Sequence, residues 1–379
     1  MNFEFTEEQI MIRDMVRDFT QREIAPLDEE LDRNGFSHAL YEKMKEMGLM
    51  GIHFPEQYGG ADGDAVTSAL TIHEIAKGSA SIALFLDAHW LAADTILYHG
   101  TEAQKTKYLP MAANEGIFAF ALTEPAAGSD AAGIQTTATK VEGGWLLRGS
   151  KAWITNAGVA DVCVVLAKTD PDAGAKGITA FIVEKGTPGF LVGRKEDKMG
   201  MRGSNTTELI LEDVKVPDEN LLGEIGGGFK IAMIALDGAR ISIGAIAAGL
   251  AEHAMNIAKD YANQRVAFGR PIAKLFAIQE KIANMAIGIR ATQLMTYDAA
   301  KLKAEGKRHT KEAAMVKVFG AEMCSKTCAE AIQTLGGYGY SKEYHVERLL
   351  RDAKLLEIGE GTSEILRMVI GTTVLAEKD

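Results

Sequence analysis

The sequence contains little cysteine and no long uninterrupted apolar run, and both absences narrow the classes it can belong to. Only three cysteines occur in 379 residues. Cys324 and Cys328 lie four apart on an expected helix without further metal-ligand residues, so we expect neither a disulfide framework nor a metal site. The most apolar stretches carry Asp87, His89 or Asp237, and the first residues show no basic segment followed by an apolar one. We therefore expect a cytoplasmic protein that does not insert into a membrane.

An excess of positive charge and the common nucleotide motifs are also absent. The formal net charge is -11, whereas a nucleic-acid-binding face must be basic to neutralise phosphates. No G-x-G-x-x-G follows an expected strand, and neither a Walker A sequence nor G-x-S-x-G occurs. His73-Glu74 is followed by Lys77 where a zinc-protease helix needs a second histidine. Nucleic acid is therefore excluded as a partner, and any nucleotide cofactor must be held in another way.

The composition is that of a globular protein, and its periodicity divides the chain into three parts. Apolar residues make up 47% and charged residues 25%. Helical periodicity is expected over residues 64–77, 80–98, 227–263, 273–304, 310–335 and 362–376. Short β-rich runs lie at residues 118–123, 145–148, 162–166, 178–183 and 208–211. We predict an α+β fold with an N-terminal α-helical domain (1–117), a middle antiparallel β-barrel or sandwich domain (118–226) and a C-terminal α-helical domain (227–379).

Two polar motifs lie in the expected β part. In LTEPAAGSD, Thr123 and Ser129 place hydroxyls on a Pro- and Gly-rich turn that could bond a ring edge, although an ordinary polar turn would look the same. In SKAWITN, Trp153 and Thr155 share one face of an expected strand. An aromatic beside a hydroxyl suits a fused-ring cofactor, whereas a core tryptophan is the structural alternative.

Three further motifs lie in the expected C-terminal helices. Arg265 in QRVAFGR could bind a pyrophosphate or could be a surface charge. Asp237 and Arg240 share a helix face, as a surface ion pair also would. Behind the glycine-rich QTLGGYGY, Glu360 stands between two glycines where a helix begins. It could be a desolvated base or simply a carboxylate favoured by the helix dipole.

Taken together, LTEPAAGSD, WITNAG, KMGMRGSNTTEL, QRVAFGRPI, QTLGGYGY and the GEGTSE segment resemble the acyl-CoA dehydrogenases over essentially the whole chain. The resemblance implies a C-terminal four-helix bundle, bound FAD, a homotetramer built as a dimer of dimers, and electron transfer flavoprotein as partner. It also implies that Glu360 removes the α-proton of an acyl-CoA while flavin takes a hydride from the β-carbon.

The resemblance further assigns the candidate ligand contacts, with the pyrophosphate and adenosine contacts coming from a neighbouring subunit. The candidate FAD residues are Phe120, Leu122, Thr123, Ser129, Trp153, Thr155, Arg265, Phe268, Gln279, Gln333, Gly337 and Thr362. The candidate substrate residues are Ser129, Asp237, Arg240, Gly359, Glu360 and Gly361.

One departure from the family pattern bears on the substrate. Many straight-chain members have a tyrosine where this chain has Gly359, and in this respect the chain resembles the isovaleryl-CoA branch. That branch, however, carries its base at the position that is Ala239 here. Because alanine cannot act as a base, Glu360 is the one candidate. Loss of a ring widens the expected pocket, and Asp87 and Trp90 are candidates to shape its distal part. We therefore predict a branched, cyclic or aryl acyl group.

Residues alone leave the direction of the reaction open, since the chemistry is reversible. The alternatives are an enoyl-CoA reductase fed by electron transfer flavoprotein, an acyl-CoA oxidase, and a non-catalytic scaffold that retains the fold. The chain is too short for the additional C-terminal helical domain of the usual oxidases, and the retained flavin-contact residues disfavour a scaffold.

Overall fold

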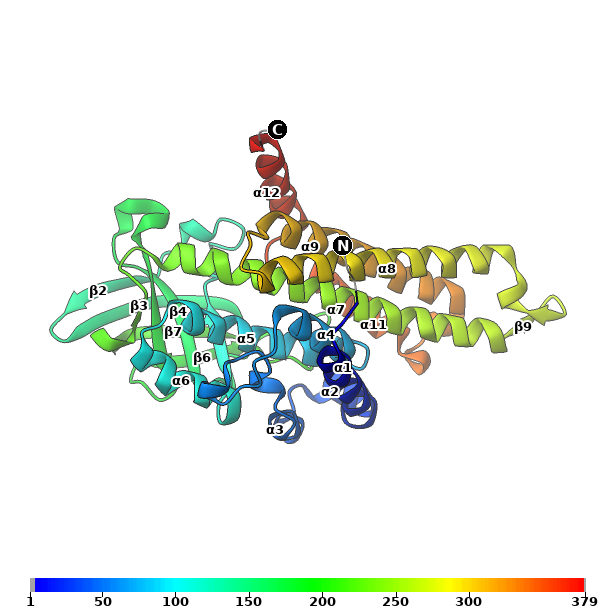
Figure 1. The fold of residues 1–379 in the computed structure, drawn as a ribbon, viewed down its shortest axis with the longest axis horizontal. Helices are drawn as coiled ribbons and strands as arrows, with labels where there is room; N and C mark the ends of the chain where they lie inside the picture. The colour runs from blue at the N-terminus through cyan, green and yellow to red at the C-terminus, as the bar shows by residue number, and fades with distance from the viewer. Residues whose placement is uncertain (1–3, 378–379) are drawn as a thin grey trace.

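The computed structural model describes residues 4–377, and its N-terminal part is helical (Figure 1). The helices are α1 (Glu7–Phe19), α2 (Asp28–Asn34), α3 (His38–Glu46), α4 (Ala65–Ala76), α5 (Ala80–His99) and α6 (Glu102–Asn114). Capping boxes fix the starts of α1 and α6: the Thr6 and Thr101 hydroxyls accept from the amides of Gln9 and Gln104, whose side chains bond back.

The middle part of the chain forms one twisted eight-stranded sheet. Its strands are β1 (Phe118–Ala121), β2 (Thr137–Val141), β3 (Gly144–Thr155), β4 (Val162–Lys168), β5 (Ile178–Glu184), β6 (Phe190–Lys195), β7 (Thr206–Pro217) and β8 (Leu221–Leu222). The order is β6-β7-β3-β2-β4-β5-β8, with β1 beside β4. Most pairings are antiparallel as predicted, but β1 and β2 each run parallel to β4. The sheet is therefore mixed rather than purely antiparallel.

The C-terminal part is a bundle in which α7, α8, α9 and α11 pack together. Its elements are α7 (Gly228–Gln264), β9 (Val266–Ala267), β10 (Arg270–Pro271), α8 (Phe276–Ala304), α9 (Thr310–Leu335), α10 (Gly337–Tyr340), α11 (Val346–Leu356) and α12 (Ser363–Ala376). The 37-residue α7 follows the long axis of the molecule, from the sheet to the β9–β10 hairpin at the opposite end (Figure 1).

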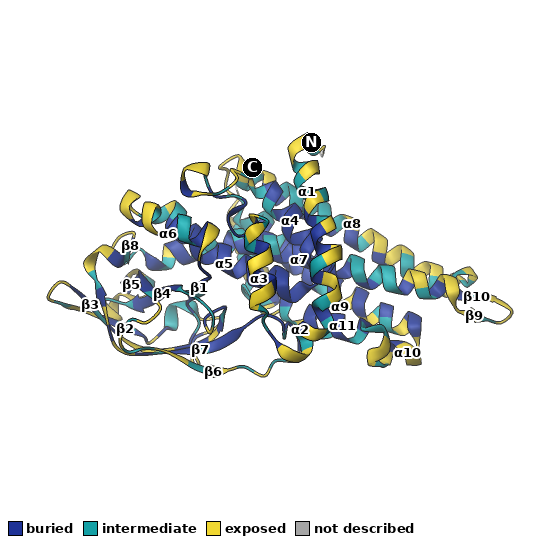
Figure 2. Cartoon of the chain, turned by 90° about the horizontal axis from the view of Figure 1, so that it is seen from below, coloured by how far each residue is buried: buried dark blue, intermediate teal, exposed yellow. Residues whose placement is uncertain are grey.

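The deepest part of the core lies where α4 and α5 cross α7 (Figure 2). Both α5 and α7 have the length and apolar composition of membrane-crossing helices, and most of each lies inside the protein. Their small residues allow close approach: a Cβ at Gly249 of α7 would lie 2.4 Å from the carbonyl oxygen of His73 on α4. The junction between the N-terminal helices and α7 is thus tightly packed.

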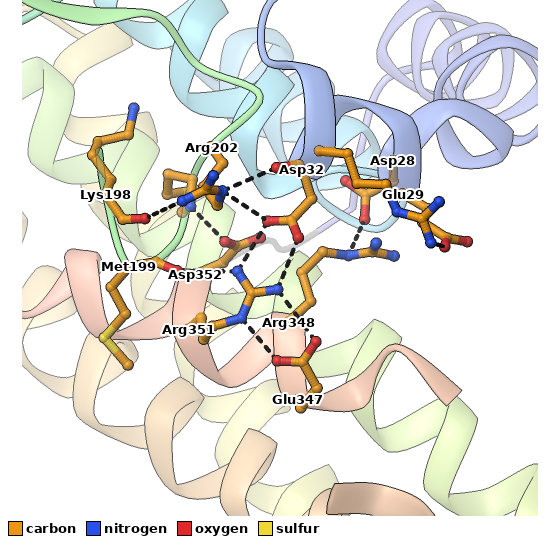
Figure 3. A network of polar contacts seen from close by, with 12 residues as sticks. Asp28, Glu29, Asp32, Lys198, Met199, Arg202, Glu347, Arg348, Arg351 and Asp352 are labelled. Atoms are coloured by element: carbon orange, nitrogen blue, oxygen red, sulfur yellow. Dashed lines mark hydrogen bonds and ion pairs between the residues drawn. The ribbon is translucent and has the colours of Figure 1, made fainter. Parts of the chain in front are cut away.

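An ion-pair network ties the three parts together (Figure 3). Arg351 on α11 donates to both carboxylate oxygens of Asp32 on α2 at 2.9 Å and to the Met199 carbonyl oxygen at 3.0 Å. Arg202, in the β6–β7 loop, donates to the Asp32 backbone carbonyl at 3.0 Å. Asp352 accepts from the Met201 amide. The loop before β7 is therefore fixed between an N-terminal and a C-terminal helix.

Candidate active site

Glu360 lies on a strained turn between α11 and α12. Its φ is +55°, a left-handed conformation that is uncommon outside glycine, and Gly361 follows at φ +101°. The Glu357 carbonyl oxygen accepts from the Ser363 amide at 3.0 Å, and the Thr362 hydroxyl caps α12. The first of these bonds closes the turn around Glu360.

Two buried cations hold the carbonyl groups of this turn. Arg240 on α7 donates from Nε to the Glu360 carbonyl oxygen at 3.1 Å, and Lys317 on α9 donates to that of Gly361. The same Arg240 pairs with Asp237 at 2.7 Å, and Asp237 accepts from the Thr310 hydroxyl at 2.6 Å. Asp237 and Arg240 are therefore a buried pair aimed at the turn, and not the surface pair that the sequence left open.

The electrostatics of the turn place opposing influences on Glu360. Burial raises the pKa of its carboxyl group, while the charges of Arg240 and Lys317 act in the opposite direction. Burial also lowers the pKa of Lys317 to about 8. A carboxylate whose proton affinity rises when water is removed can serve as a general base for a weakly acidic C–H.

The turn after β1 is fastened to β3 by a buried ion pair. Lys151 donates to the Leu122 carbonyl at 3.0 Å and to the Glu124 carboxylate at 2.7 Å, and both side chains are buried. Glu124 also accepts from the amides of Gln135 and Thr136, and the Ala152 amide donates to the Thr123 carbonyl. These bonds fix Leu122 and Thr123 beside the start of the SKAWITN segment.

The sheet here offers a surface that fits a flat ring system. Trp153 has φ +61° at an irregularity in the β3–β7 pairing, and its side chain is 59% exposed, so it is not a core tryptophan. Trp153 and Thr155 flank the buried Ile154, and Thr155 and Thr123 are both partly exposed. An exposed indole with hydroxyl groups nearby is the surface that an isoalloxazine ring would cover. The residues present thus fit FAD.

The remaining candidate residues do not all meet at this surface. Phe120 is half-buried on β1, and Ser129 is exposed on the following turn. Arg265, Phe268 and Gln279 lie around the β9–β10 hairpin, at the far end of the long axis from the sheet (Figure 1).

Gln333 and Gly337 belong to the same far end as the hairpin. Both are exposed at the α9–α10 junction, where Tyr338 packs near Tyr261, one turn before Arg265. Within one chain, the candidate residues therefore lie at three places: the surface of the sheet around Trp153, the Glu360 turn and the far end of the long axis.

Several polar residues of the site escaped the sequence reasoning. Lys317 lies on the buried face of α9 that also carries Ala313, Ala321 and Cys324. A lysine at an apolar-face position is rare unless it is paired, so the sequence could have indicated a buried functional lysine here. The Lys151–Glu124 pair gives no such signal, because its two members are joined only by the fold. Trp90 donates to the Met50 carbonyl at 2.8 Å and packs on His53, so these contacts place it in the N-terminal core.

Comparison with known families matches all three parts of the chain. Residues 6–116, 119–214 and 226–375 match the N-terminal, middle and C-terminal domains of acyl-CoA dehydrogenase, respectively. An acyl-CoA dehydrogenase of Bacillus subtilis (strain 168) is 51% identical over 98% of both chains. The acryloyl-CoA reductase (NADH) of Anaerotignum propionicum is 46% identical over 99% of this chain and 96% of its own. The caffeyl-CoA reductase-Etf complex subunit CarC of Acetobacterium woodii is 42% identical over 98% of this chain and 99% of its own.

Solved structures agree with this assignment. Butyryl-CoA dehydrogenase from Megasphaera elsdenii superposes with a TM-score of 0.97 at 45% identity, covering 99% of this chain and 100% of that one. An acyl-CoA dehydrogenase from Bacillus anthracis complexed with FAD superposes with a TM-score of 0.93 at 40% identity, covering 98% of this chain and 67% of that one. The chain therefore belongs to the acyl-CoA dehydrogenase family and is an FAD oxidoreductase that acts on the CH–CH bond of acyl-CoA or enoyl-CoA thioesters.

Proposed function

We propose that this protein oxidises an acyl-CoA thioester to the trans-2-enoyl-CoA, with Glu360 as the base. The observation that carries the proposal is the geometry of the Glu360 turn. The backbone of Glu360 is left-handed, and Arg240 and Lys317 donate to the backbone carbonyl groups of Glu360 and Gly361, respectively. Glu360 takes the proton from Cα, and the pair of electrons left behind forms the new double bond as hydride leaves Cβ. FAD, when bound, supplies the acceptor for that hydride.

The turn also supports stabilisation of the enolate that develops during proton removal. The Glu360 backbone N–H has no hydrogen-bond partner within residues 4–377. We propose that it donates to the thioester carbonyl oxygen, where negative charge grows in the transition state. Asp237, Arg240 and the two flanking glycines then border the bound thioester, and the twelve FAD contacts are those assigned from the sequence.

The alternative is the reverse reaction, in which Glu360 delivers a proton to Cα of an enoyl-CoA. The names of the acryloyl-CoA and caffeyl-CoA reductases support it, because both relatives match nearly the whole chain. The latter name also supports electron transfer flavoprotein as redox partner. We propose a cytoplasmic homotetramer in which the residues around the β9–β10 hairpin complete a neighbour's FAD site.

The environment of Gly359 supports a wide acyl pocket. A Cβ built there would lie no closer than 3.6 Å to any atom, an ordinary van der Waals contact, and its φ is not positive. The backbone therefore does not require glycine, so the missing side chain leaves room for the ligand. This supports a branched, cyclic or aryl acyl group over a short straight chain.

An anaerobic titration of the flavin-loaded protein tests the proposal. Butyryl-, isovaleryl-, cyclohexanecarbonyl- and 3-phenylpropionyl-CoA are added in turn while the visible flavin band is followed. We expect bleaching by a branched, cyclic or aryl thioester, slowed at least about 10³-fold in Glu360→Gln. Equal or better turnover of butyryl-CoA would contradict the wide pocket. Bleaching by none of them, with reoxidation of the reduced protein by an enoyl-CoA, would assign the reductase direction.

A further inference from the structure

A cavity beside the ion-pair network of Figure 3 takes no part in the chemistry above. Its volume is about 210 Å³, many times the space that one water molecule needs. The end of α2 forms one wall, and the end of β6 with the loop that follows it forms the other. The lining carries four cationic and three carboxylate side chains, so the balance of charge inside it depends on which of them are paired.

Two of the carboxylate groups are bonded to arginines that lie outside the lining. Asp32 accepts from Arg351 through both of its oxygens, each at 2.9 Å. Glu196 accepts from Arg194 at 3.2 Å. Because these two acids are neutralised from elsewhere, they leave the cations of the lining without their charge.

The two arginines of the lining have acids of their own. Arg202 donates to the Asp197 carboxylate at 2.7 Å, which accounts for the third acid of the lining. Arg33 bonds the carboxylate of Glu29, one turn earlier on α2. Among the lining side chains, only the two lysines therefore remain to be balanced.

Neither lysine has an anionic partner. Lys195 makes no hydrogen bond or ion pair within residues 4–377, and its Nζ lies 2.8 Å from where a Cβ on Gly35 would be. Lys198 donates to the Ser204 carbonyl oxygen and the Thr206 hydroxyl, which are both neutral. Its side chain extends away from the carboxylates drawn in Figure 3. An ammonium group has three donors, so Lys198 keeps one of them and its whole charge.

The two ammonium groups also act on each other. Burial and, next, the charge of Lys195 lower the pKa of Lys198 to about 8. An anion bound between them would relieve this repulsion. A phosphoryl group carries nearly two negative charges at neutral pH and three acceptor oxygens, and lysine is a common phosphate ligand.

We infer that this cavity binds the phosphoryl group of a small molecule between Lys195 and Lys198. Gly35 contributes through its missing side chain, which leaves the space beside the Lys195 ammonium open. The cavity shares no residue with the Glu360 turn or with the candidate FAD contacts, so it is a second site. A ligand there would join α2 to the β6–β7 loop and stabilise the folded protein.

Calorimetric titration of the flavin-loaded protein with phosphate, diphosphate and AMP tests the inference, with malonate as a dianion that lacks phosphorus. We expect saturable binding of at least one phosphate compound, a rise in Tm, and an affinity that falls with added salt. Lys195→Gln should weaken Kd about tenfold or more, as for the loss of a charge-assisted hydrogen bond.

The choice of variants keeps folding separate from binding. Lys195 is exposed, so its glutamine variant should fold, and Lys198→Gln is the second variant for the same loss of affinity. Lys215→Gln changes an exposed lysine on β7 outside the cavity and should leave Kd unchanged. If Lys198→Gln does not fold, Lys195→Gln decides alone.

The outcomes are distinct. No saturable binding, or a Kd that Lys195→Gln leaves unchanged, overturns the inference. Malonate that binds as tightly as the phosphate compounds overturns the assignment of a phosphoryl group. Titration with CoA then separates two sources of that group: a second CoA site that Lys195→Gln removes assigns the phosphates of CoA, whereas a single CoA site that this variant leaves intact assigns a free phosphorylated compound.

Discussion

At the scale of single residues, the proton affinity of Glu360 is set by burial on one side and by two cations on the other. Burial raises its pKa, and Arg240 and Lys317 lower it. Arg240 also neutralises Asp237, so Lys317 is the cation that can be changed with less disturbance of other pairs. The charge of Lys317 therefore offers a direct way to vary the base.

Replacing Lys317 by methionine should shift the pH profile toward alkaline values. Without the cation, the pKa of Glu360 rises, so the carboxylate needed for proton removal forms at higher pH. The acidic limb of kcat/KM against pH should therefore move upward. Lys317→Arg is the control that keeps the charge and the bond to the Gly361 carbonyl. An acidic limb at the same pH in the methionine variant would contradict the assignment of Glu360 as the titrating base.

A tyrosine at position 359 should narrow the acyl pocket. Because the backbone there accepts a Cβ, Gly359→Tyr adds a ring without forcing the turn to change. We expect kcat/KM for branched or aryl thioesters to fall about tenfold or more relative to butyryl-CoA. Gly359→Ala is the matched control and should change this ratio little. An unchanged ratio in the tyrosine variant would show that the ring points away from the ligand.

At the scale of elements, the turn after β1 depends on a buried pair whose members come from different segments. Lys151→Met leaves Glu124 buried without its counter-charge, and such a loss costs about 3–5 kcal/mol of unfolding free energy. Loosening of Leu122 and Thr123 should also weaken FAD binding.

Urea unfolding and the FAD content after dilution measure the two effects of the Lys151 change. The double variant Lys151→Met, Glu124→Gln should recover part of the stability, since no unpaired charge remains. A double variant as unstable as the single one would mean that packing, and not the unpaired charge, is lost.

Helix α11 carries a pH-sensitive carboxyl group at the junction of the three parts. Burial raises the pKa of Asp352 to about 7, and the Met201 amide donates to it. The native state thus holds a proton that the unfolded chain releases at about pH 4. The stabilising contribution of this group is present below pH 4 and is lost as the pH rises to about 7.

Asp352→Asn should therefore flatten the pH dependence of stability. The amide keeps an acceptor for the Met201 N–H but does not ionise. Tm measured between pH 5 and pH 8 should fall less in the variant than in the parent protein. A parallel fall in both proteins would assign the pH dependence to other groups.

Local sequence signals predicted the long elements but not every strand of the sheet. Residues 80–98 and 310–335 have regular apolar periods and form α5 and α9 almost to the residue. The structure buries no residue of β6 and only Ala138 of β2, and neither strand shows the alternation of apolar and polar residues that marks a half-buried strand. The short α11 lay within the glycine-bounded terminal motifs and was not predicted as a helix.

The same limit applies to the candidate site. Glu360 was found because two glycines and a helix start flank it in the chain. Its supports, Arg240 and Lys317, lie 120 and 44 residues away from the carbonyls they bond. Contacts at such separations follow from the packing of α7 and α9 and leave no local pattern.

At the scale of the whole molecule, the hairpin beyond α7 is the most exposed candidate element. Phe268 is 89% exposed at φ +52°, so its ring contributes nothing to the stability of its own chain. Arg240 and Arg265 are separated along α7 by about 38 Å at 1.5 Å per residue. One chain therefore cannot bring Arg240 and Arg265 to the same flavin ring.

Phe268→Asp should weaken assembly and FAD retention together. Aspartate tolerates the left-handed backbone better than most residues, so the hairpin itself should keep its shape. We expect a smaller species by light scattering, with FAD lost in proportion to the dissociated fraction. Lys274→Asp, which also introduces an acid near the hairpin but removes no exposed ring, is the control. Dissociation with full FAD content would contradict a shared site.

The length of α7 has a genetic consequence. If each cofactor is held by the sheet of one chain and the hairpin of another, a chain without its base and a chain without its hairpin arginine are defective at different places. Co-expression of Glu360→Gln and Arg265→Ala chains should then yield mixed assemblies in which some sites combine an intact turn with an intact hairpin. Two inactive alleles would restore part of the activity in the same cell, although neither does so alone.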